Sequence, residues 1–304
     1  MNLARLELDS TMVRGLASFP EKAVANAAMT EVRFTSSGVR LRRHSNQRGD
    51  LTWLLLPGGP GIGSESLQEL ADAMAVPGAI WLVDLPGDGS NRDAPGAPAD
   101  PFSVWPGAIL EAAQAVVNPV FVGHSTGGMY LLDTPGLEGV VRGLALLDTA
   151  PDAAWHPKFL EMTQRHPLPG VEAATTIYEA DRRDENIAAI AVASAEWNFT
   201  PEGVERGREL LARMPYNAAA VDWSDAHFDH IYKARWWPEH LPVLRLAGRD
   251  DRIVWQGGWQ TAQYQTPNVI DRLIDAAGHF PWIENPAQVR AAFQAFAERV
   301  LTVG

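Results

Sequence analysis

Three short segments carry residue types that could do acyl-transfer chemistry together: a serine between glycines, a glycine-rich loop and a late histidine. The serine is Ser125, in the pattern Gly123-x-Ser125-x-Gly127. It directly follows an apolar stretch, 119–122, that predicts a strand, and it precedes a stretch compatible with a helix. A serine at such a sharp turn projects its hydroxyl above the end of the strand, and the flanking glycines let strand and helix approach closely. The pattern therefore predicts Ser125 as a nucleophile.

Acyl transfer also needs N–H donors aimed at the oxygen that becomes negatively charged. One candidate is the N–H of Thr126, which begins the predicted helix. The loop Pro57-Gly58-Gly59-Pro60-Gly61 ends the first predicted parallel strand, and Gly59 is its better donor candidate. Glycine-rich loops also hold phosphates, but neither G-x-x-x-x-G-K-[ST] nor G-x-G-x-x-G occurs here. We therefore predict Gly59 and Thr126 as an oxyanion hole, and His124 as a packing residue.

The base and its acid follow in the order Ser, Asp, His along the chain. His279 lies just after the last predicted strand, where a loop can place an imidazole over the serine. For the acid that holds the correct histidine tautomer, we favour Asp251 over its neighbour Asp250. Asp148, at the end of the fourth predicted parallel strand, is a third choice.

These residues need a sheet whose strands end at one edge. A hairpin is predicted over 32–34 and 39–42, and apolar runs bounded by glycine and proline predict parallel strands over 51–56, 79–83, 119–122, 144–147, 243–247 and 269–274. Helices are expected between them, over 64–75, 108–117, 255–264 and 286–300. Strands that alternate with helices in this way predict an α/β fold with a mostly parallel sheet.

The strand–helix rhythm stops after Asp148 and resumes at Val243. Between them the pattern is helical and rich in tryptophan. We predict one α/β core, formed by residues 1–150 and 242–304, with a helical lid inserted at 151–241.

Composition limits the class of protein. The chain has 304 residues, 46% of them hydrophobic, a formal net charge of −12 and no cysteine. The negative charge argues against nucleic acid or an anionic membrane surface as partner, and the absence of cysteine excludes thiol chemistry. The N-terminus has scattered charges and no secretory pattern, and no apolar run suits a membrane span. We expect a cytoplasmic protein that acts on a small molecule and needs no cofactor.

In combination, the motifs PGGPG, GHSTGG, GRDD and AGHFPWIENP resemble those of the α/β-hydrolase superfamily, and the loop and the insertion are similar to its proline iminopeptidase and esterase-like branches. The resemblance covers about residues 51 to 300. It implies an α/β-hydrolase fold, a lid over the active site and an acid three residues after the glycine, which is Asp251. The family's glycine loop is often preceded by histidine, whereas this chain has Pro57.

The lid and the histidine loop offer candidates for substrate binding. We predict Trp155 and Trp197 of the lid, and Phe280 next to His279, as residues of an apolar pocket, although aromatic residues of a lid also form its own core. Glu196 loosely resembles the glutamate with which proline iminopeptidases hold a free amine. His227 and His230 could share a helix face, but no H-E-x-x-H accompanies them, and we expect no metal.

The leading hypothesis is a serine hydrolase that cleaves an ester, lactone or amide through an acyl-enzyme. A carboxylesterase or lactonase is the first choice, and a proline iminopeptidase-like aminopeptidase is the second. A lyase that uses the same residues for proton transfer and a ligand-sensing receptor stay open as alternatives. The sequence does not indicate the oligomeric state.

Overall fold

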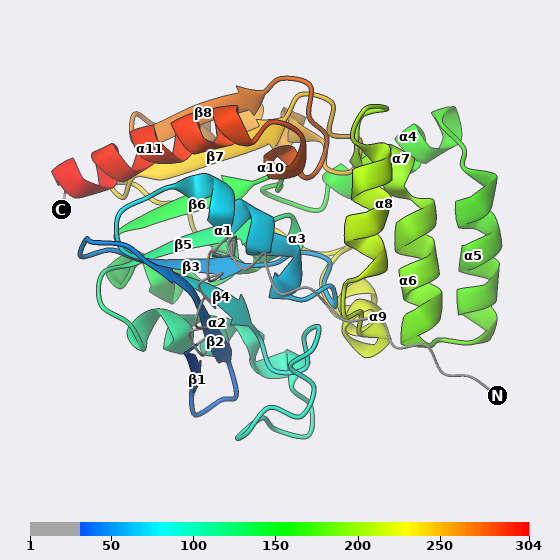
Figure 1. Ribbon diagram of the computed structural model, residues 1–304, viewed down its shortest axis with the longest axis horizontal. Coiled ribbons are helices and arrows are strands. Elements are labelled where there is room, and N and C mark those ends of the chain that lie inside the picture. The colour runs from blue at the N-terminus through cyan, green and yellow to red at the C-terminus, as the bar shows by residue number, and fades with distance from the viewer. Residues whose placement is uncertain (1–30, 304) are drawn as a thin grey trace, which may run out of the picture.

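The computed structural model describes residues 31–303, so the prediction about the N-terminal pattern and the first 30 residues of the predicted core lie outside the described part. The described chain forms an eight-stranded sheet in the order β1-β2-β4-β3-β5-β6-β7-β8 (Figure 1). The predicted fold class is confirmed. The strands are β1 (Val32–Phe34), β2 (Arg40–Asn46), β3 (Thr52–Leu56), β4 (Ala79–Asp84), β5 (Pro119–His124), β6 (Gly143–Leu147), β7 (Val243–Gly248) and β8 (Val269–Ile274).

The first two strands form the predicted hairpin. Its turn is closed by a hydrogen bond from the Thr35 N–H to the Val39 carbonyl, 3.0 Å long, and contains Gly38 at φ 86°. β2 then pairs with β4 in the antiparallel direction, while the pairs from β4 through β3, β5, β6 and β7 to β8 are parallel. The carboxyl ends of the parallel strands therefore meet at one edge of the sheet, where ligands bind in open α/β sheets.

Both faces of the sheet are buried, which explains the continuous apolar runs in the parallel strands. Successive residues of a strand point to opposite faces. Trp53 belongs to the core cluster beneath the last helix, where it packs edge-on against Phe293 and Phe296 at 6.2 and 6.0 Å between ring centres. Its neighbour Leu54 belongs to the cluster on the other face, with Ile109.

The helices of the core cover these two faces. Their bounds, with short 3-10 helices marked η, are η1 (Ser64–Leu67), α1 (Gln68–Met74), η2 (Phe102–Val104), α2 (Trp105–Gln114), α3 (Thr126–Leu132), η3 (Pro135–Gly139), α10 (Pro281–Glu284) and α11 (Pro286–Val303). On α11, four apolar residues at helical spacing are buried: Val289, Phe293, Phe296 and Val300. Within the described residues, no helix is long and apolar enough to cross a membrane.

One predicted helix is wrong. The stretch 255–264 forms two 3-10 helices, η4 (Gln256–Gln260) and η5 (Ala262–Tyr264), instead of one α-helix. Adjacent glycines at 257 and 258 weaken a helix in this segment. A Cβ at Gly257 would also lie 2.1 Å from the ring of Trp255, so the chain turns tightly around that side chain.

The chain between β6 and β7 is helical, as predicted. It folds into helices that stand beyond one end of the sheet (Figure 1), and they are α4 (Trp155–Arg165), α5 (Pro169–Ala180), α6 (Asp184–Ala193), α7 (Ala195–Asn198), α8 (Val204–Ala212) and α9 (Ala218–His227). We call residues 151–241 the lid. Its contacts with the core include the Asn217 N–H, which donates to the Gly61 carbonyl at 2.8 Å, and Thr200, which hydrogen-bonds Glu284. The boundaries of the lid and the core stay a prediction.

Candidate active site

Ser125 lies at the turn between β5 and α3, in a strained backbone conformation with φ 51° and ψ −126°. Non-glycine residues adopt a positive φ only where the surrounding structure demands it. Close packing of the backbone at two places holds Ser125 in this conformation. A Cβ at Gly123 would lie 2.6 Å from the Gly128 Cα, and a Cβ at Gly127 would lie 2.2 Å from the Pro57 carbonyl oxygen. The two glycines of the motif are therefore required by packing.

The glycine loop lies against Ser125. A Cβ at Gly58 would lie 2.6 Å from the Ser125 Cβ, and Gly59 has φ 111°, which favours glycine. The loop is held from behind because the Gly61 N–H donates to Asp88 Oδ1 at 2.8 Å. Burial raises the pKa of Asp88 to about 7, with a further contribution from the nearby Asp84.

The predicted oxyanion donors border this loop. Within residues 31–303, the N–H groups of Gly59 and Thr126 donate to no backbone carbonyl of a turn or loop and to no side chain. Gly59 also lines the cavity described below, beside Ser125. The N–H of Thr126 is at the first position of α3, where a helix leaves its N–H groups without an internal partner. Both groups can therefore donate to a ligand oxygen.

His279 lies in the loop between β8 and α10, and its Nδ1 is 3.1 Å from Asp251 Oδ2. The other oxygen of Asp251 accepts from the Ile253 N–H at 2.8 Å and the Val254 N–H at 3.3 Å. Both side chains are buried, with 5% of His279 and 1% of Asp251 exposed. Asp250, the alternative acid, is exposed and makes no hydrogen bond to His279. The structure therefore brings Asp251 to the histidine and leaves Asp250 outside.

The backbone of His279 also helps to fix the position of the imidazole. The backbone N–H of His279 donates to the Asn198 carbonyl at 2.7 Å, which ties the histidine loop to the lid. His124 Nε2 lies 2.9 Å from the His279 carbonyl oxygen, and its ring packs on Phe280 and Trp282. Burial lowers the pKa of His124 well below its usual range, so His124 stays neutral. These contacts agree with its prediction as a packing residue, although it also borders the cavity.

Ser125 and His279 open onto one cavity of about 280 Å³ between the core and the lid. This volume is at the small end for ligand sites. Among the described residues that line it there is no aspartate, glutamate, lysine or arginine. Apart from the two glycines, Ser125 and His279, the lining is mostly apolar and includes Ile187, Ile190, Leu211, Tyr216, Val221 and Phe280.

Three of the four residues predicted to bind substrate lie away from this cavity. Trp197 is buried, and its Nε1 donates to the His166 carbonyl at 2.8 Å, so its ring packs inside the lid. Trp155 packs against Phe159 in the lid. Glu196 is exposed and pairs with Arg208. Phe280 alone borders the cavity. Pattern alone does not separate a lid's own core from its inner surface, so the sequence could not place these three residues.

Three of the lining residues that sequence reasoning missed, Ile187, Ile190 and Ala191, come from α6. Its sequence from Ile187 to Ala193 is continuously apolar and shows no pronounced polar face. Such a run predicts that the helix is buried on several sides. It does not indicate which side of the helix faces a ligand. The histidines considered as metal ligands have other contacts: His230 pairs with Asp225, and the ring of His227 packs on Trp223.

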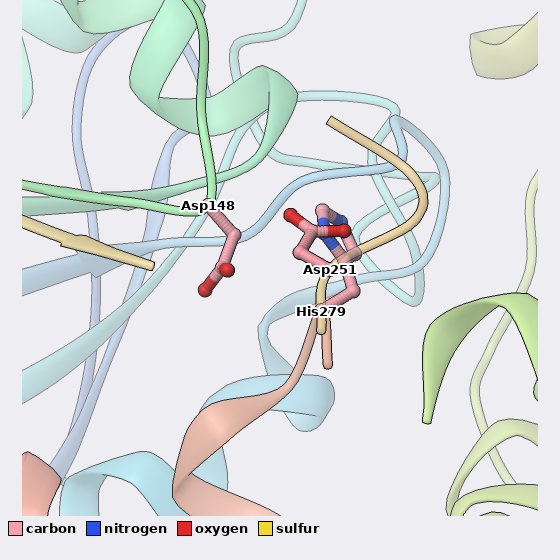
Figure 2. A group of neighbouring side chains, drawn as sticks. All are labelled: Asp148, Asp251 and His279. Atoms are coloured by element: carbon pink, nitrogen blue, oxygen red, sulfur yellow. The ribbon is translucent and has the colours of Figure 1, made fainter. Parts of the chain in front are cut away.

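One group of side chains in the described part has the spacing of metal ligands: Asp148, Asp251 and His279, whose ligand atoms lie within 4.8 Å of one another (Figure 2). Asp148 follows β6, the neighbour of β7 in the sheet. Its Oδ1 accepts from the Gly248 N–H at 2.8 Å, so Asp148 lies behind the pair of Asp251 and His279. It is wholly buried and does not border the cavity.

A parallel sheet with a serine at the turn after its central strand, a covering set of helices and a buried His–Asp pair defines an enzyme of the α/β-hydrolase class. Residues 53–292 match the Alpha/beta hydrolase family, so the chain belongs to this family.

Similarity to individual proteins agrees with this assignment. The chain is 27% identical over 246 residues to a pimeloyl-[acyl-carrier protein] methyl ester esterase of Xanthomonas oryzae pv. oryzae (strain MAFF 311018), with 76% of this chain and 89% of that protein covered. Its fold resembles that of a proline iminopeptidase-related protein from Thermus thermophilus, with a TM-score of 0.67, 21% identity and 90% and 99% of the two chains covered. An esterase from Rhodococcus sp. ECU1013 aligns with a TM-score of 0.61, 20% identity and 86% and 94% coverage.

Proposed function

We propose that this protein is a serine carboxylesterase that hydrolyses small esters with an apolar acyl or alcohol group. The observation that carries the proposal is the shared cavity: Ser125, on its strained turn, and His279, held by Asp251, border the same apolar space. An apolar lining of this size suits an uncharged group of a few carbon atoms.

The proposed reaction has two halves. His279 Nε2 takes the proton of the Ser125 hydroxyl while Oγ attacks the ester carbonyl, and the N–H groups of Gly59 and Thr126 hold the oxyanion. The C–O bond to the alcohol then breaks, and His279 returns the proton to the leaving alcohol. Water, deprotonated by His279, attacks the acyl-enzyme and releases the acid and free Ser125. Asp251 keeps the Nδ1–H tautomer and stabilises the imidazolium that forms in each half.

The substrate class follows from the cavity and from the relatives. The Xanthomonas relative is named as a pimeloyl-[acyl-carrier protein] methyl ester esterase, and an apolar cavity is compatible with the acyl chain of such an ester. We therefore place methyl esters of short and medium-length acids first, with lactones next. Lid residues of α6 supply apolar surface above the serine, so we also propose that the lid selects the acyl group.

An aminopeptidase is the weaker alternative. Recognition of a free amine needs an acidic group facing the substrate. Glu196 is exposed, bonded to Arg208 at 2.8 Å, and absent from the lining of the cavity. A neutral ester therefore fits the cavity better than an ammonium group.

The test combines labelling and turnover. Native protein should react with a fluorophosphonate probe at one site per chain, while Ser125→Ala and His279→Ala should not react. Native protein should hydrolyse p-nitrophenyl and methyl esters of two to eight carbons, and prolyl-naphthylamide should stay intact. Folded protein that neither labels nor hydrolyses any ester would contradict the proposal and favour a ligand-sensing role. Faster cleavage of the prolyl amide than of every ester would favour the aminopeptidase.

A further inference from the structure

Asp148 is a buried acidic residue that the proposed reaction does not use. Figure 2 shows it converging with Asp251 and His279 from three separate segments: the end of β6, the loop after β7 and the loop after β8. No part of Asp148 is exposed to solvent. The ligand atoms of the three side chains lie within 4.8 Å of one another. An acidic group placed so close to the proposed acid of the reaction affects how that acid behaves.

Two ionised carboxylates cannot share such a site. They repel one another, and burial removes the water that would otherwise screen them. Asp148 Oδ1 accepts from the Gly248 N–H at 2.8 Å, but its Oδ2 is buried and finds no donor among the described residues. A proton on this oxygen removes both problems, because it cancels one charge and turns the unpartnered acceptor into a donor.

The proton belongs on Asp148 and not on Asp251. Asp251 accepts hydrogen bonds from His279 Nδ1 and from the N–H groups of Ile253 and Val254, so both of its oxygens already have donors. Asp148 has a single donor. Burial, and next the negative charge of Asp251, raise the pKa of Asp148 well above its usual range.

The charged groups around Asp148 come from three elements. Asp251 faces it from the loop after β7 and His279 from the loop after β8. The third is Glu284 on α10, whose charge raises the pKa of Asp148 further. Both acidic neighbours favour a neutral Asp148.

We propose that Asp148 is a positioning residue for the reaction: its protonated carboxyl group donates a hydrogen bond from Oδ2 to the Asp251 carboxylate and holds that carboxylate in place for His279. This inference rests on the proposed serine hydrolase function. The backbone of Asp148 supports it, since a φ of 45° is a strained conformation for an aspartate. Such strain persists where the side chain must reach a defined place.

The first test compares Asp148→Asn with Asp148→Ala. An asparagine keeps a donor toward Asp251 and an acceptor for the Gly248 N–H, so kcat/KM should stay within about threefold of the native value. Alanine loses both, and kcat should fall by about 10- to 100-fold, the loss that is typical when the hydrogen-bond partner of a metal-binding side chain is removed. KM should change little, because Asp148 does not border the cavity.

The pH profile separates this role from that of an ionised, purely structural aspartate. A neutral Asp148 contributes no charge. In a plot of kcat/KM against pH, Asp148→Asn should therefore leave the acidic limb at the same pH as in native protein. If Asp148 were ionised, its removal would take a negative charge from beside His279. The acidic limb would then move to lower pH by about one unit, because a nearby negative charge favours the protonated form of a base. A limb that moves in this way would overturn the proposal.

Infrared spectroscopy reads the proton directly. Asp88, whose pKa is about 7, adds its own carboxyl band in both proteins, so the measurement is the difference between the spectra of native protein and Asp148→Asn at pH 7. This difference should contain the C=O band of a buried protonated carboxyl group. Absence of the band from the difference spectrum would overturn the inference while Ser125 labelling still stood. Loss of activity in EDTA with recovery on Zn²⁺ alone would also overturn it, because the cluster would then be a metal site. A band in native protein whose Ser125 does not label would remove the positioning role together with the proposed function.

Discussion

Replacing Gly127 by alanine should damage both stability and turnover. The new Cβ would lie 2.2 Å from the Pro57 carbonyl oxygen and 2.7 Å from that of Leu56, whereas real Cβ atoms keep at least 3.0 Å from such atoms. The end of β3 and the start of α3 must therefore move apart by at least about 0.8 Å. Overpacking of this kind costs about 1–3 kcal/mol of folding free energy.

The same displacement moves the proposed oxyanion donors apart, because Pro57 leads into the glycine loop and Gly127 directly follows Thr126. A misplacement of about 1 Å lowers turnover by about 100-fold, which is about 2.7 kcal/mol of activation free energy. The assay is urea unfolding together with kcat/KM on the best ester of the panel. We expect a lower unfolding midpoint and a loss of activity in the protein that remains folded.

Gly107→Ala is the matched control. Gly107 lies in α2, as Gly127 lies in α3, but a Cβ there meets no atom within 4 Å. Alanine is the better helix former, so this variant should gain about 0.5–1 kcal/mol and keep its activity. A Gly127→Ala protein that unfolds and turns over like native protein would refute the argument that close packing forces glycine at this turn.

Three further predictions concern charged residues. Asp251→Asn should lower kcat by about 10⁴-fold because the amide stabilises the wrong tautomer of His279, while Asp250→Asn should keep a kcat near the native value. The measurement is kcat for ester hydrolysis by both variants. A large loss in Asp250→Asn and none in Asp251→Asn would exchange the roles of the two residues. Glu196→Gln should leave ester hydrolysis unchanged and alter stability by less than about 1 kcal/mol, since its ion pair is exposed. A tenfold loss would place this side chain in the substrate site. Burial raises the pKa of Asp88 from 3.8 to about 7, so the folded protein holds a proton that the unfolded chain releases, and stability should fall by at most about 4 kcal/mol as pH rises across that window. Asp88→Asn should flatten this dependence in urea titrations between pH 4 and 8, and an unchanged slope would rule out Asp88 as its source.

Much of the fold could be predicted because its signals are local. Apolar runs that end in glycine and proline located the parallel strands, since a strand buried on both faces must be apolar throughout. The α-helix predicted over 255–264 does not form, and the reason is local too: the adjacent residues Gly257 and Gly258 break a helix there.

The lid shows where prediction from pattern stops. Its helical nature follows from composition, but Trp155 and Trp197 pack within it, while Ile187 and Ile190 of α6 border the cavity. All four are apolar residues in helical segments. Which of them meets a ligand depends on how the helices pack over the sheet, and that information is not carried by any one segment.

By itself, the sequence determined which residue types could do chemistry and on which turns they stand, because the glycine motif and the order of serine, aspartate and histidine are properties of the chain. Only the tertiary structure decided which carboxylate meets His279. Asp250 and Asp251 are neighbours of identical chemistry, and the loop after β7 turns one toward the histidine and the other to solvent. It also brought Asp148, which is far away along the chain, against the same pair. Two adjacent parallel strands that end at one edge of a sheet place distant residues within a few ångströms, and a linear sequence does not show that distance.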